Sequence, residues 1–145
     1  MKKVIVTGGS GFIGSNLVNY LIKKRYFVIN IDKLTYSSNK LKDKIRNNKN
    51  YKLIKLDIIH KKKLIDIIKK NKPKAIFNLA AETHVDRSID GPEKFIHTNI
   101  NGTFSLLESL RFLKKKKITP KLIHISTDEV YGDVNKGFRT DENHR

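Results

Sequence analysis

The sequence predicts an α/β protein built on a doubly wound parallel sheet. Three observations support this prediction: short apolar runs alternate with longer amphipathic stretches, a glycine-rich turn follows the first run, and prolines interrupt the chain ahead of later runs. Alternating strands and helices specify a parallel sheet with helices on both faces, joined by right-handed crossovers. At 145 residues the chain is long enough for one domain with a core and too short for two.

The first half of the chain is expected to contain three strands and two helices. Residues 4–7 are a short apolar run that ends in glycines, which is typical of a strand and its turn. Residues 12–24 carry apolar side chains at helical spacing, and residues 27–31 are again apolar and strand-like. Residues 36–50 are polar and rich in Lys and Asn, so we expect a loop with one short helix before a third strand at 51–56.

The second half of the chain is expected to continue the alternation. Residues 61–70 have apolar side chains spaced for one helix face, and after a proline the run 75–79 predicts a fourth strand. A long helix is expected over 92–117, because proline is favoured at the first helical position, and a fifth strand over 121–126. If the ligand lies at the usual switch point of such a sheet, the strand order is 3-2-1-4-5.

The composition excludes several classes of protein. There is no Cys, so neither a disulfide framework nor a thiolate metal site is possible, and we expect no metal. No apolar run approaches the ~18 residues of a membrane helix, and glycines follow the first run too early for a signal peptide, so we expect a cytoplasmic protein without a membrane partner. The net charge is +17, but the lysines are spread over many segments without a nucleic-acid motif, so no nucleic-acid partner is expected. A basic nucleic-acid-binding protein stays open as an alternative.

Three glycines with the spacing G-x-x-G-x-x-G, Gly8, Gly11 and Gly14, open the first helix. The first allows a tight turn, the second lets a pyrophosphate approach the backbone, and the third lets helix and strand pack closely. The helix N-terminus offers unpaired N–H groups and a partial positive charge to phosphates. The pattern predicts a Rossmann-type dinucleotide site, and a plain turn is the alternative.

Two acids at strand ends extend this prediction. Asp32 ends the second strand, eighteen residues after Gly14, where a carboxylate can accept hydrogen bonds from ribose hydroxyls and repel a 2′-phosphate. NAD is therefore expected rather than NADP, although the adjacent Lys33 weakens that choice; a helix or loop cap is the alternative for Asp32. Asp57 ends the third strand and could bond an adenine amino group or cap the next helix.

Four further stretches give the chain a specific family resemblance. The glycine spacing is that of the extended short-chain dehydrogenases, and from residue 1 to about 132 the chain resembles the dTDP-glucose 4,6-dehydratases among them. The stretches are Asp32–Tyr36, Asn78–Ser88, Thr98–Thr103 and His124–Gly132. The Thr-Asp-Glu triplet in the last stretch is the most specific element; without the resemblance it is an ordinary helix N-cap region.

The resemblance implies a role for each matched residue. The residues expected to contact NAD are Gly8, Gly11, Phe12, Ile13, Gly14, Asp32, Lys33, Leu34, Thr35, Asp57, Ile58, Leu79, Ala80, Ala81, Glu82, Thr83 and Thr98. Thr83 and Thr127 would touch the substrate sugar. In the family's reaction, C4 of the sugar is oxidised, water is eliminated across C5 and C6, and the hydride returns, which leaves a 4-keto-6-deoxy sugar. Asp128 would be the general acid and Glu129 the general base.

The family also carries a Tyr-x-x-x-Lys pair after the fifth strand, whereas here Tyr131 has Asn135 at that spacing. We therefore expect residues 1–132 to form an NAD-binding domain that is incomplete at its C-terminal side and inactive alone. Residues 133–145 would be an irregular tail, and the substrate domain would be absent. The family's homodimer uses the helix expected at 92–117, and dimerisation of this chain is doubtful. The alternatives are a dehydratase or epimerase acting on a UDP-sugar, and an NAD-binding module without catalysis.

Overall fold

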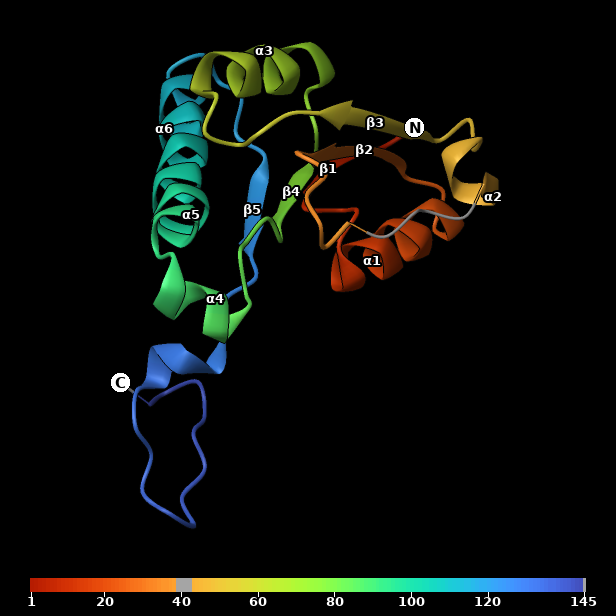
Figure 1. The fold of residues 1–145 in the computed structure, drawn as a ribbon. Helices are drawn as coiled ribbons and strands as arrows, with labels where there is room; N and C mark the ends of the chain where they lie inside the picture. The colour runs from red at the N-terminus through yellow and green to blue at the C-terminus, as the bar shows by residue number, and fades with distance from the viewer. Residues whose placement is uncertain (39–42, 145) are drawn as a thin grey trace.

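Five parallel strands form one sheet in the computed structural model, which describes residues 1–38 and 43–144 (Figure 1). The strands are β1 (Lys3–Thr7), β2 (Phe27–Asp32), β3 (Tyr51–Lys55), β4 (Ala75–Asn78) and β5 (Lys121–His124). Their order in the sheet is β3-β2-β1-β4-β5, which confirms the predicted order. The direction of winding reverses between β1 and β4, and ligands of such sheets bind at the carboxyl ends of the strands at this switch point.

Helices connect the successive strands. They are α1 (Phe12–Lys23), α2 (Asp43–Arg46), α3 (Lys61–Asn71), α4 (Val85–Asp90), α5 (Glu93–Phe95) and α6 (Thr103–Lys114). In addition, Ile96–Gly102 form a π-helical turn between α5 and α6, and Asp128–Tyr131 form a 3₁₀ turn after β5. The short helix expected in the 36–50 loop is α2, and residues 39–42 of that loop lie outside the described residues. The sequence did not predict α4.

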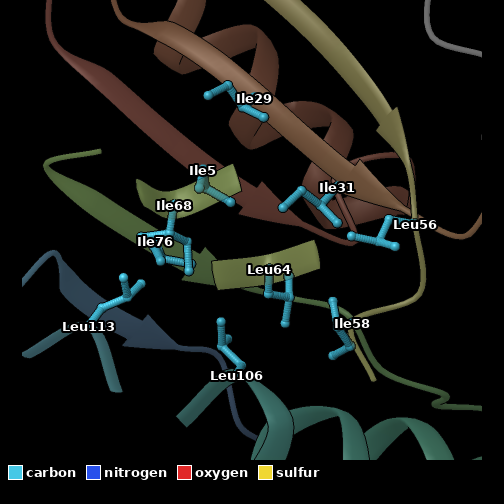
Figure 2. Packing of buried hydrophobic residues seen from close by; sticks show 10 residues of the cluster. All are labelled: Ile5, Ile29, Ile31, Leu56, Ile58, Leu64, Ile68, Ile76, Leu106 and Leu113. Carbon is cyan, nitrogen blue, oxygen red and sulfur yellow. The ribbon is translucent and has the colours of Figure 1, made fainter. Parts of the chain in front are cut away.

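Apolar side chains cover both faces of the sheet. On one face α1 packs in a cluster that consists of Val4, Val6, Val18, Leu21 and Val28. On the other face α3 and α6 bury a second cluster (Figure 2), which consists of Ile5, Ile29, Ile31, Leu56, Ile58, Leu64, Ile68, Ile76, Leu106 and Leu113. Because successive side chains of a strand point to opposite faces, one apolar run in β1 supplies both clusters. This two-sided cover explains why the central strands are apolar throughout rather than alternating.

The long helix predicted over 92–117 is confirmed as one helical run from Glu93 to Lys114, but its middle part, Ile96–Gly102, is π-helical. Pro92 is the N-cap residue rather than the first helical residue, and α6 ends at Lys114. A π-helical turn holds one extra residue, and tertiary contacts support it here. The buried Thr98 accepts a hydrogen bond from Lys33 Nζ at 2.7 Å, and a Cβ at Gly102 would come within 2.8 Å of the Ile58 side chain.

Beyond β5 the chain leaves the sheet. In Figure 1 this blue segment extends below α4 and projects away from the other elements. Between residues 132 and 144, all of which are described, there is no helix or strand. The domain boundary at residue 132 itself stays a prediction. Among the described residues, no helix is both long and apolar enough to cross a membrane.

Candidate functional site

A crevice opens at the carboxyl ends of β1, β2, β3 and β4, where the switch point lies. Its lining consists of Gly8, Gly11, Ile31, Asp32, Lys33, Thr35, Ser37, Ser38, Leu56, Asp57, Ile58, Leu79, Ala80, Ala81, Glu82 and Thr98. These residues come from segments that are far apart in the sequence, so the sheet order assembles the crevice rather than any local motif.

Glycines shape the turn between β1 and α1. Gly8 has a φ of +68°, in the left-handed region, and a Cβ there would lie 2.7 Å from the backbone nitrogen of Ala80. A Cβ at Gly14 would collide with the carbonyl oxygen of Gly8, so the first turn of α1 packs directly on the preceding turn. A Cβ at Gly11 would meet only the Gly8 carbonyl oxygen, at 3.4 Å. Gly11 therefore leaves open space on its crevice side, whereas Gly8 and Gly14 are required for packing.

The N-terminus of α1 reaches the crevice without a cap. Gly11 is the N-cap residue and supplies no side-chain hydrogen bond, and the first turn carries no acid. The first N–H groups of an α-helix have no intrahelical acceptor and carry a partial positive charge. An anionic group next to Gly11 would therefore meet donors that the helix does not pair.

Asp32 ties the end of β2 to the glycine turn. Its carboxylate accepts hydrogen bonds from the backbone N–H of Ser10 at 2.9 Å and of Leu34 at 2.8 Å, and Ser38 Oγ lies 3.5 Å away. Asp32 is 8% exposed, at the floor of the crevice. The loop-cap alternative is therefore correct for part of its function. An ionised carboxylate has about four acceptor positions, so Asp32 can also accept ligand hydroxyls.

Lys33 bridges two other parts of the crevice wall. Its Nζ donates to Thr98 Oγ1 at 2.7 Å and pairs with Glu82 Oε1 at 3.2 Å. Glu82 is buried, and its second oxygen accepts a hydrogen bond from Tyr36 Oη at 3.3 Å. The Arg87 guanidinium lies over the Tyr36 ring, 3.9 Å from its centroid. These contacts join the end of β2 to the segment after β4 and to the π-helical turn, and they occupy the Lys33 ammonium.

Asp57 lies in the wall that follows β3. Its Oδ1 accepts a hydrogen bond from the backbone N–H of Ile59 at 3.1 Å, and its Oδ2 lies 3.3 Å from His97 Nε2. The N-cap residue of α3 is His60, which makes no side-chain cap bond. The interpretation of Asp57 as that cap is therefore wrong, because the chain makes one more turn before α3 begins. A contact between Asp57 and an adenine stays a prediction.

A buried polar group lies beneath the glycine turn. Asn30 Nδ2 donates to Ser10 Oγ and to Tyr51 Oη, both at 3.0 Å, while Asn30 Oδ1 has no hydrogen-bond partner among the described residues. Burial raises the pKa of Tyr51, the hydrogen bond with Asn30 opposes that shift, and the Asp32 charge adds to it. Tyr51 is therefore a neutral phenol that positions Asn30 under the turn.

Most residues predicted to contact a dinucleotide line the crevice. They are Gly8, Gly11, Asp32, Lys33, Thr35, Asp57, Ile58, Leu79, Ala80, Ala81, Glu82 and Thr98. The predicted residues outside the lining are Phe12, Ile13, Gly14, Leu34 and Thr83. Phe12 and Ile13, which begin α1 directly after the glycine turn, are 78% and 63% exposed.

Sequence reasoning missed four lining residues: Ile31, Leu56, Ser37 and Ser38. Ser37 and Ser38 could have been found, because they directly follow the stretch Asp32–Tyr36 that carries part of the family resemblance. Ile31 and Leu56 are buried core residues next to strand ends, and nothing in their residue type indicates a ligand.

The triplet Thr127, Asp128 and Glu129 lies at the start of the 3₁₀ turn after β5. All three residues are exposed, and none of them lines the crevice. The backbone N–H of Ile125 donates to the Asn78 carbonyl at 3.0 Å, so the triplet follows the strand next to the one that leads into residues 79–82. Their roles as acid, base and sugar contact stay predictions.

The fold and the crevice define a Rossmann-type protein of the short-chain dehydrogenase class, with a switch-point site suited to a dinucleotide. The family model described as GDP-mannose 4,6 dehydratase matches residues 5–145. The chain belongs to this family of nucleotide-sugar enzymes.

Individual relatives narrow the similarity to dTDP-glucose 4,6-dehydratases, in agreement with the predicted resemblance. The enzyme from Haemophilus influenzae is 48% identical over 143 residues, which cover 93% of this chain and 42% of that protein. The solved dTDP-glucose 4,6-dehydratase from Bacillus anthracis, in complex with NAD, is 39% identical with a TM-score of 0.82 and covers 100% of this chain and 44% of its own.

A UDP-sugar enzyme also lies among the similar structures. The UDP-glucose 4-epimerase from Thermotoga maritima, solved with UDP-glucose, is 34% identical with a TM-score of 0.80 and covers 98% of this chain and 43% of its own. The chain therefore spans less than half the length of the relatives that it matches.

Proposed function

We propose that this chain is the NAD-binding part of a dTDP-glucose 4,6-dehydratase. The observation that carries the proposal is the crevice, where an uncapped helix N-terminus, open space at Gly11 and the acid Asp32 lie together. The diphosphate of NAD would bind at the N-terminus of α1, and Asp32 would accept the hydroxyls of the adenosine ribose. The similar dehydratase from Bacillus anthracis was solved with NAD, which supports this proposal.

Two charged side chains affect the choice between NAD and NADP. The Asp32 carboxylate would repel a 2′-phosphate. Lys33 could attract one, but its ammonium is held by Glu82 and Thr98. We expect saturable NAD binding with a lower dissociation constant than for NADP, measured by titration calorimetry.

The triplet Thr127, Asp128 and Glu129 would act on the substrate sugar, and its two acids would transfer the protons of the reaction. Bound NAD would supply an acceptor for the hydride from C4 of the sugar and, later, the donor of that hydride to C6. Glu129 would remove the C5 proton, which a C4 ketone makes acidic, and Asp128 would give a proton to the C6 oxygen as it leaves as water. Thr127 would donate a hydrogen bond to the C4 oxygen. This division of roles requires one carboxyl group to be ionised and its neighbour to be protonated. Two carboxyl groups in different surroundings can achieve this.

The base for the first oxidation is not among these residues. In the family a Tyr-x-x-x-Lys pair after the fifth strand takes the C4 hydroxyl proton, and here Tyr131 is followed by Asn135 at that spacing. A positioned acid or base contributes about 10²–10⁴-fold to a rate. We therefore expect purified 1–145 to bind NAD without turning over dTDP-glucose. A folded chain with no saturable NAD signal would overturn the binding proposal, and clear turnover would refute the expected inactivity.

A UDP-sugar epimerase is the second candidate function, because the Thermotoga maritima epimerase is also similar over nearly the whole chain. The adjacent acids Asp128 and Glu129 favour a dehydratase, since an epimerase expels no hydroxyl group and needs no acid to assist it. Competition between dTDP-glucose and UDP-glucose for the longer protein would separate the two. An NAD-binding module without catalysis would leave both acids without a function.

We also propose that the longer protein is a homodimer. Four large apolar side chains, Ile96, Ile100, Phe104 and Leu107, are 48%, 57%, 65% and 49% exposed along one side of the π-helical turn and α6. By resemblance to the family this helix forms one half of a dimer interface. We expect 1–145 alone to sediment as a monomer. If 1–145 were instead a dimer and Phe104→Asp dissociated it, these four apolar side chains would be sufficient for dimerisation.

A further inference from the structure

The sheet edge opposite the crevice is strongly basic. Residues 1–3, 24–26, 72–74 and 115–121, which precede or begin β1, β2, β4 and β5, hold ten lysines and arginines and no acid. These ten cations are called the basic edge below. They are widely scattered in the sequence, which hides the cluster, and the parallel sheet brings them together because all strands begin at the same edge.

Backbone hydrogen bonds join three of these segments directly and reach the fourth at Phe27, the residue after 24–26. The Lys2 carbonyl accepts the N–H of Phe27 at 2.9 Å, the Lys3 carbonyl accepts the N–H of Lys74 at 2.8 Å, and the Lys74 carbonyl accepts the N–H of Lys121 at 3.0 Å. Neighbouring strands lie about 4.8 Å apart, so four strand ends form a row about 15 Å long.

The basic edge is a plane rather than a single row, because the helices on both faces of the sheet end there. Lys24 and Arg25 follow α1 on one face, while Lys72 follows α3 and residues 115–117 follow α6 on the other (Figure 1). A hollow of about 250 Å³ lies between the turns before β4 and β5, and Lys72, Lys74 and Lys117 contribute to its lining. Cations therefore follow the ends of helices in both outer layers and precede or begin strands of the middle layer.

The protein does not neutralise these charges itself. Among the described residues, no ion pair involves a cation of the basic edge, and all of them except Lys3 are exposed. Two lie over exposed rings: Lys24 Nζ is 5.5 Å from the Tyr20 centroid and Lys116 Nζ is 4.9 Å from the Phe112 centroid. Like charges gathered in this way repel one another and weaken the compact state, unless an anion from outside compensates them.

Three of the cations occupy backbone positions that favour glycine. Arg25, Lys72 and Lys117 have φ angles of 62°, 44° and 58° at the ends of α1, α3 and α6. Glycine is the usual residue there, because a Cβ makes the left-handed region costly. The helix dipole favours cations near these ends, but it does not require them at the left-handed positions. Charged side chains at these three positions therefore come at a cost to the backbone, which supports a function for the charges.

We propose that the basic edge attaches the protein peripherally to an anionic lipid bilayer. A planar array of ammonium groups matches a plane of headgroups, and no recognised nucleic-acid-binding motif accompanies these cations. Helix C-termini offer carbonyl groups rather than N–H donors, so binding depends on many charges acting together within the ~8 Å screening length. Tyr20 and Phe112 would lie at the headgroup level beside their lysines. The crevice, at the opposite edge of the sheet, would stay open to solution.

Vesicle co-sedimentation of the full 1–145 chain tests the proposal at about 0.15 M salt. The vesicles contain equal parts of phosphatidylcholine and phosphatidylglycerol, or phosphatidylcholine alone. The test variant combines Arg25→Gly, Lys72→Gly and Lys117→Gly, which suit the left-handed positions and should preserve the fold. The matched control combines Lys62→Gln, Lys63→Gln and Lys94→Gln, which remove the same charge elsewhere.

We expect binding to the anionic vesicles only. At about fivefold per charge, the test variant should bind about 100-fold more weakly, while the control stays within about threefold of the parent. Absence of vesicle binding by the parent chain, or equal losses in the two variants, would overturn the proposal. Tighter binding to a DNA duplex than to the vesicles at the same salt would overturn it in favour of a nucleic-acid surface. Circular dichroism and the melting temperature show that each variant is folded.

Discussion

The Asp32 carboxylate accepts the backbone N–H of Ser10 at 2.9 Å, so the acid expected to bind the ribose also holds the glycine turn in place. Ser10 in turn accepts a hydrogen bond from Asn30, which lies on the same strand as Asp32. The turn that would receive a diphosphate and the acid that would receive a ribose therefore form one unit.

Asp32→Ala is expected to reduce both stability and NAD affinity. It leaves the N–H groups of Ser10 and Leu34 without their charged acceptor, and such hydrogen bonds contribute about 1.5–3 kcal/mol each. Urea unfolding should show a loss of at least about 2 kcal/mol in the free energy of unfolding, and NAD titration should show weaker binding. Asp66→Ala, an exposed acid on α3, is the control and should change neither quantity appreciably. Unchanged stability in Asp32→Ala would contradict the structural role.

Gly11→Ala and Gly14→Ala are expected to separate ligand binding from folding. At Gly11 a Cβ has room in the free protein, at 3.4 Å from its nearest neighbour, so stability should change little while NAD binding is lost. At Gly14 the Cβ collides with backbone, which cannot move cheaply, so the chain should be destabilised by about 1–3 kcal/mol or more. Thermal unfolding with and without NAD measures both effects. If Gly11→Ala bound NAD with parental affinity, the diphosphate could not lie there.

Glu108 links α6 to α3 and should make stability depend on acid pH. Its carboxylate accepts hydrogen bonds from Arg111 Nε at 2.6 Å and Nη2 at 2.8 Å, and Lys61 Nζ lies 3.3 Å away. The Arg111 guanidinium lowers the pKa of Glu108 from 4.5 to about 2. A lowered folded-state pKa stabilises the fold above the unfolded value and loses that effect as the pH falls from 4.5 towards 2.

Glu108→Gln should therefore have a lower melting temperature than the parent at neutral pH, and the difference should shrink as the pH approaches 2. Calorimetry from neutral to acid pH measures this difference. Glu93→Gln, an exposed acid on α5, is the matched control and should show a smaller difference at neutral pH. A difference between Glu108→Gln and the parent that does not depend on pH would contradict the assigned ion pair.

Tyr51 should make stability depend on alkaline pH. Its pKa is raised in the folded state, chiefly by burial, so the native phenol keeps a proton that the unfolded chain loses above pH ~10. The stability from this group is complete below that pH and is lost as the pH rises through the folded-state pKa. Tyr51→Phe loses the Asn30 hydrogen bond, which is worth about 1 kcal/mol, and it has no phenol to titrate, so its stability lacks this dependence on alkaline pH. The stability gap between Tyr51→Phe and the parent should narrow above pH ~10 in urea unfolding; a constant gap would show that the phenol does not titrate with folding.

The strand order and the two-sided core could be predicted because they follow from periodicity and glycine placement. Val4, Ile5 and Val6 are apolar in succession, and only burial on both faces explains such a run. The π-helical turn and α4 could not be predicted, because their causes are contacts between distant segments. Thr98 turns towards Lys33, sixty-five positions earlier, and no local spacing records that bond.

Residues of the candidate site were predictable where their position in the local structure requires one residue type. Gly8 needs a left-handed backbone, and Asp32 follows the glycines at a fixed distance in the βαβ unit. The contacts around Glu82 were not predictable, since a buried acid paired with Lys33 and Tyr36 depends on how three segments meet. The positions of Asp128 and Glu129 relative to a substrate depend on the same kind of long-range assembly.

The π-helical turn at Ile96–Gly102 determines which side chains of α6 face the sheet. An α-helix rotates by about 100° per residue, so deleting one residue from this turn would swing Leu106 and Leu113 out of the core and bring other faces of α6 over the sheet. The one extra residue of the π-helical turn therefore determines which side of α6 faces the core. Thr98, in the crevice wall, belongs to this same turn. Its position and the orientation of α6 about its own axis therefore change together.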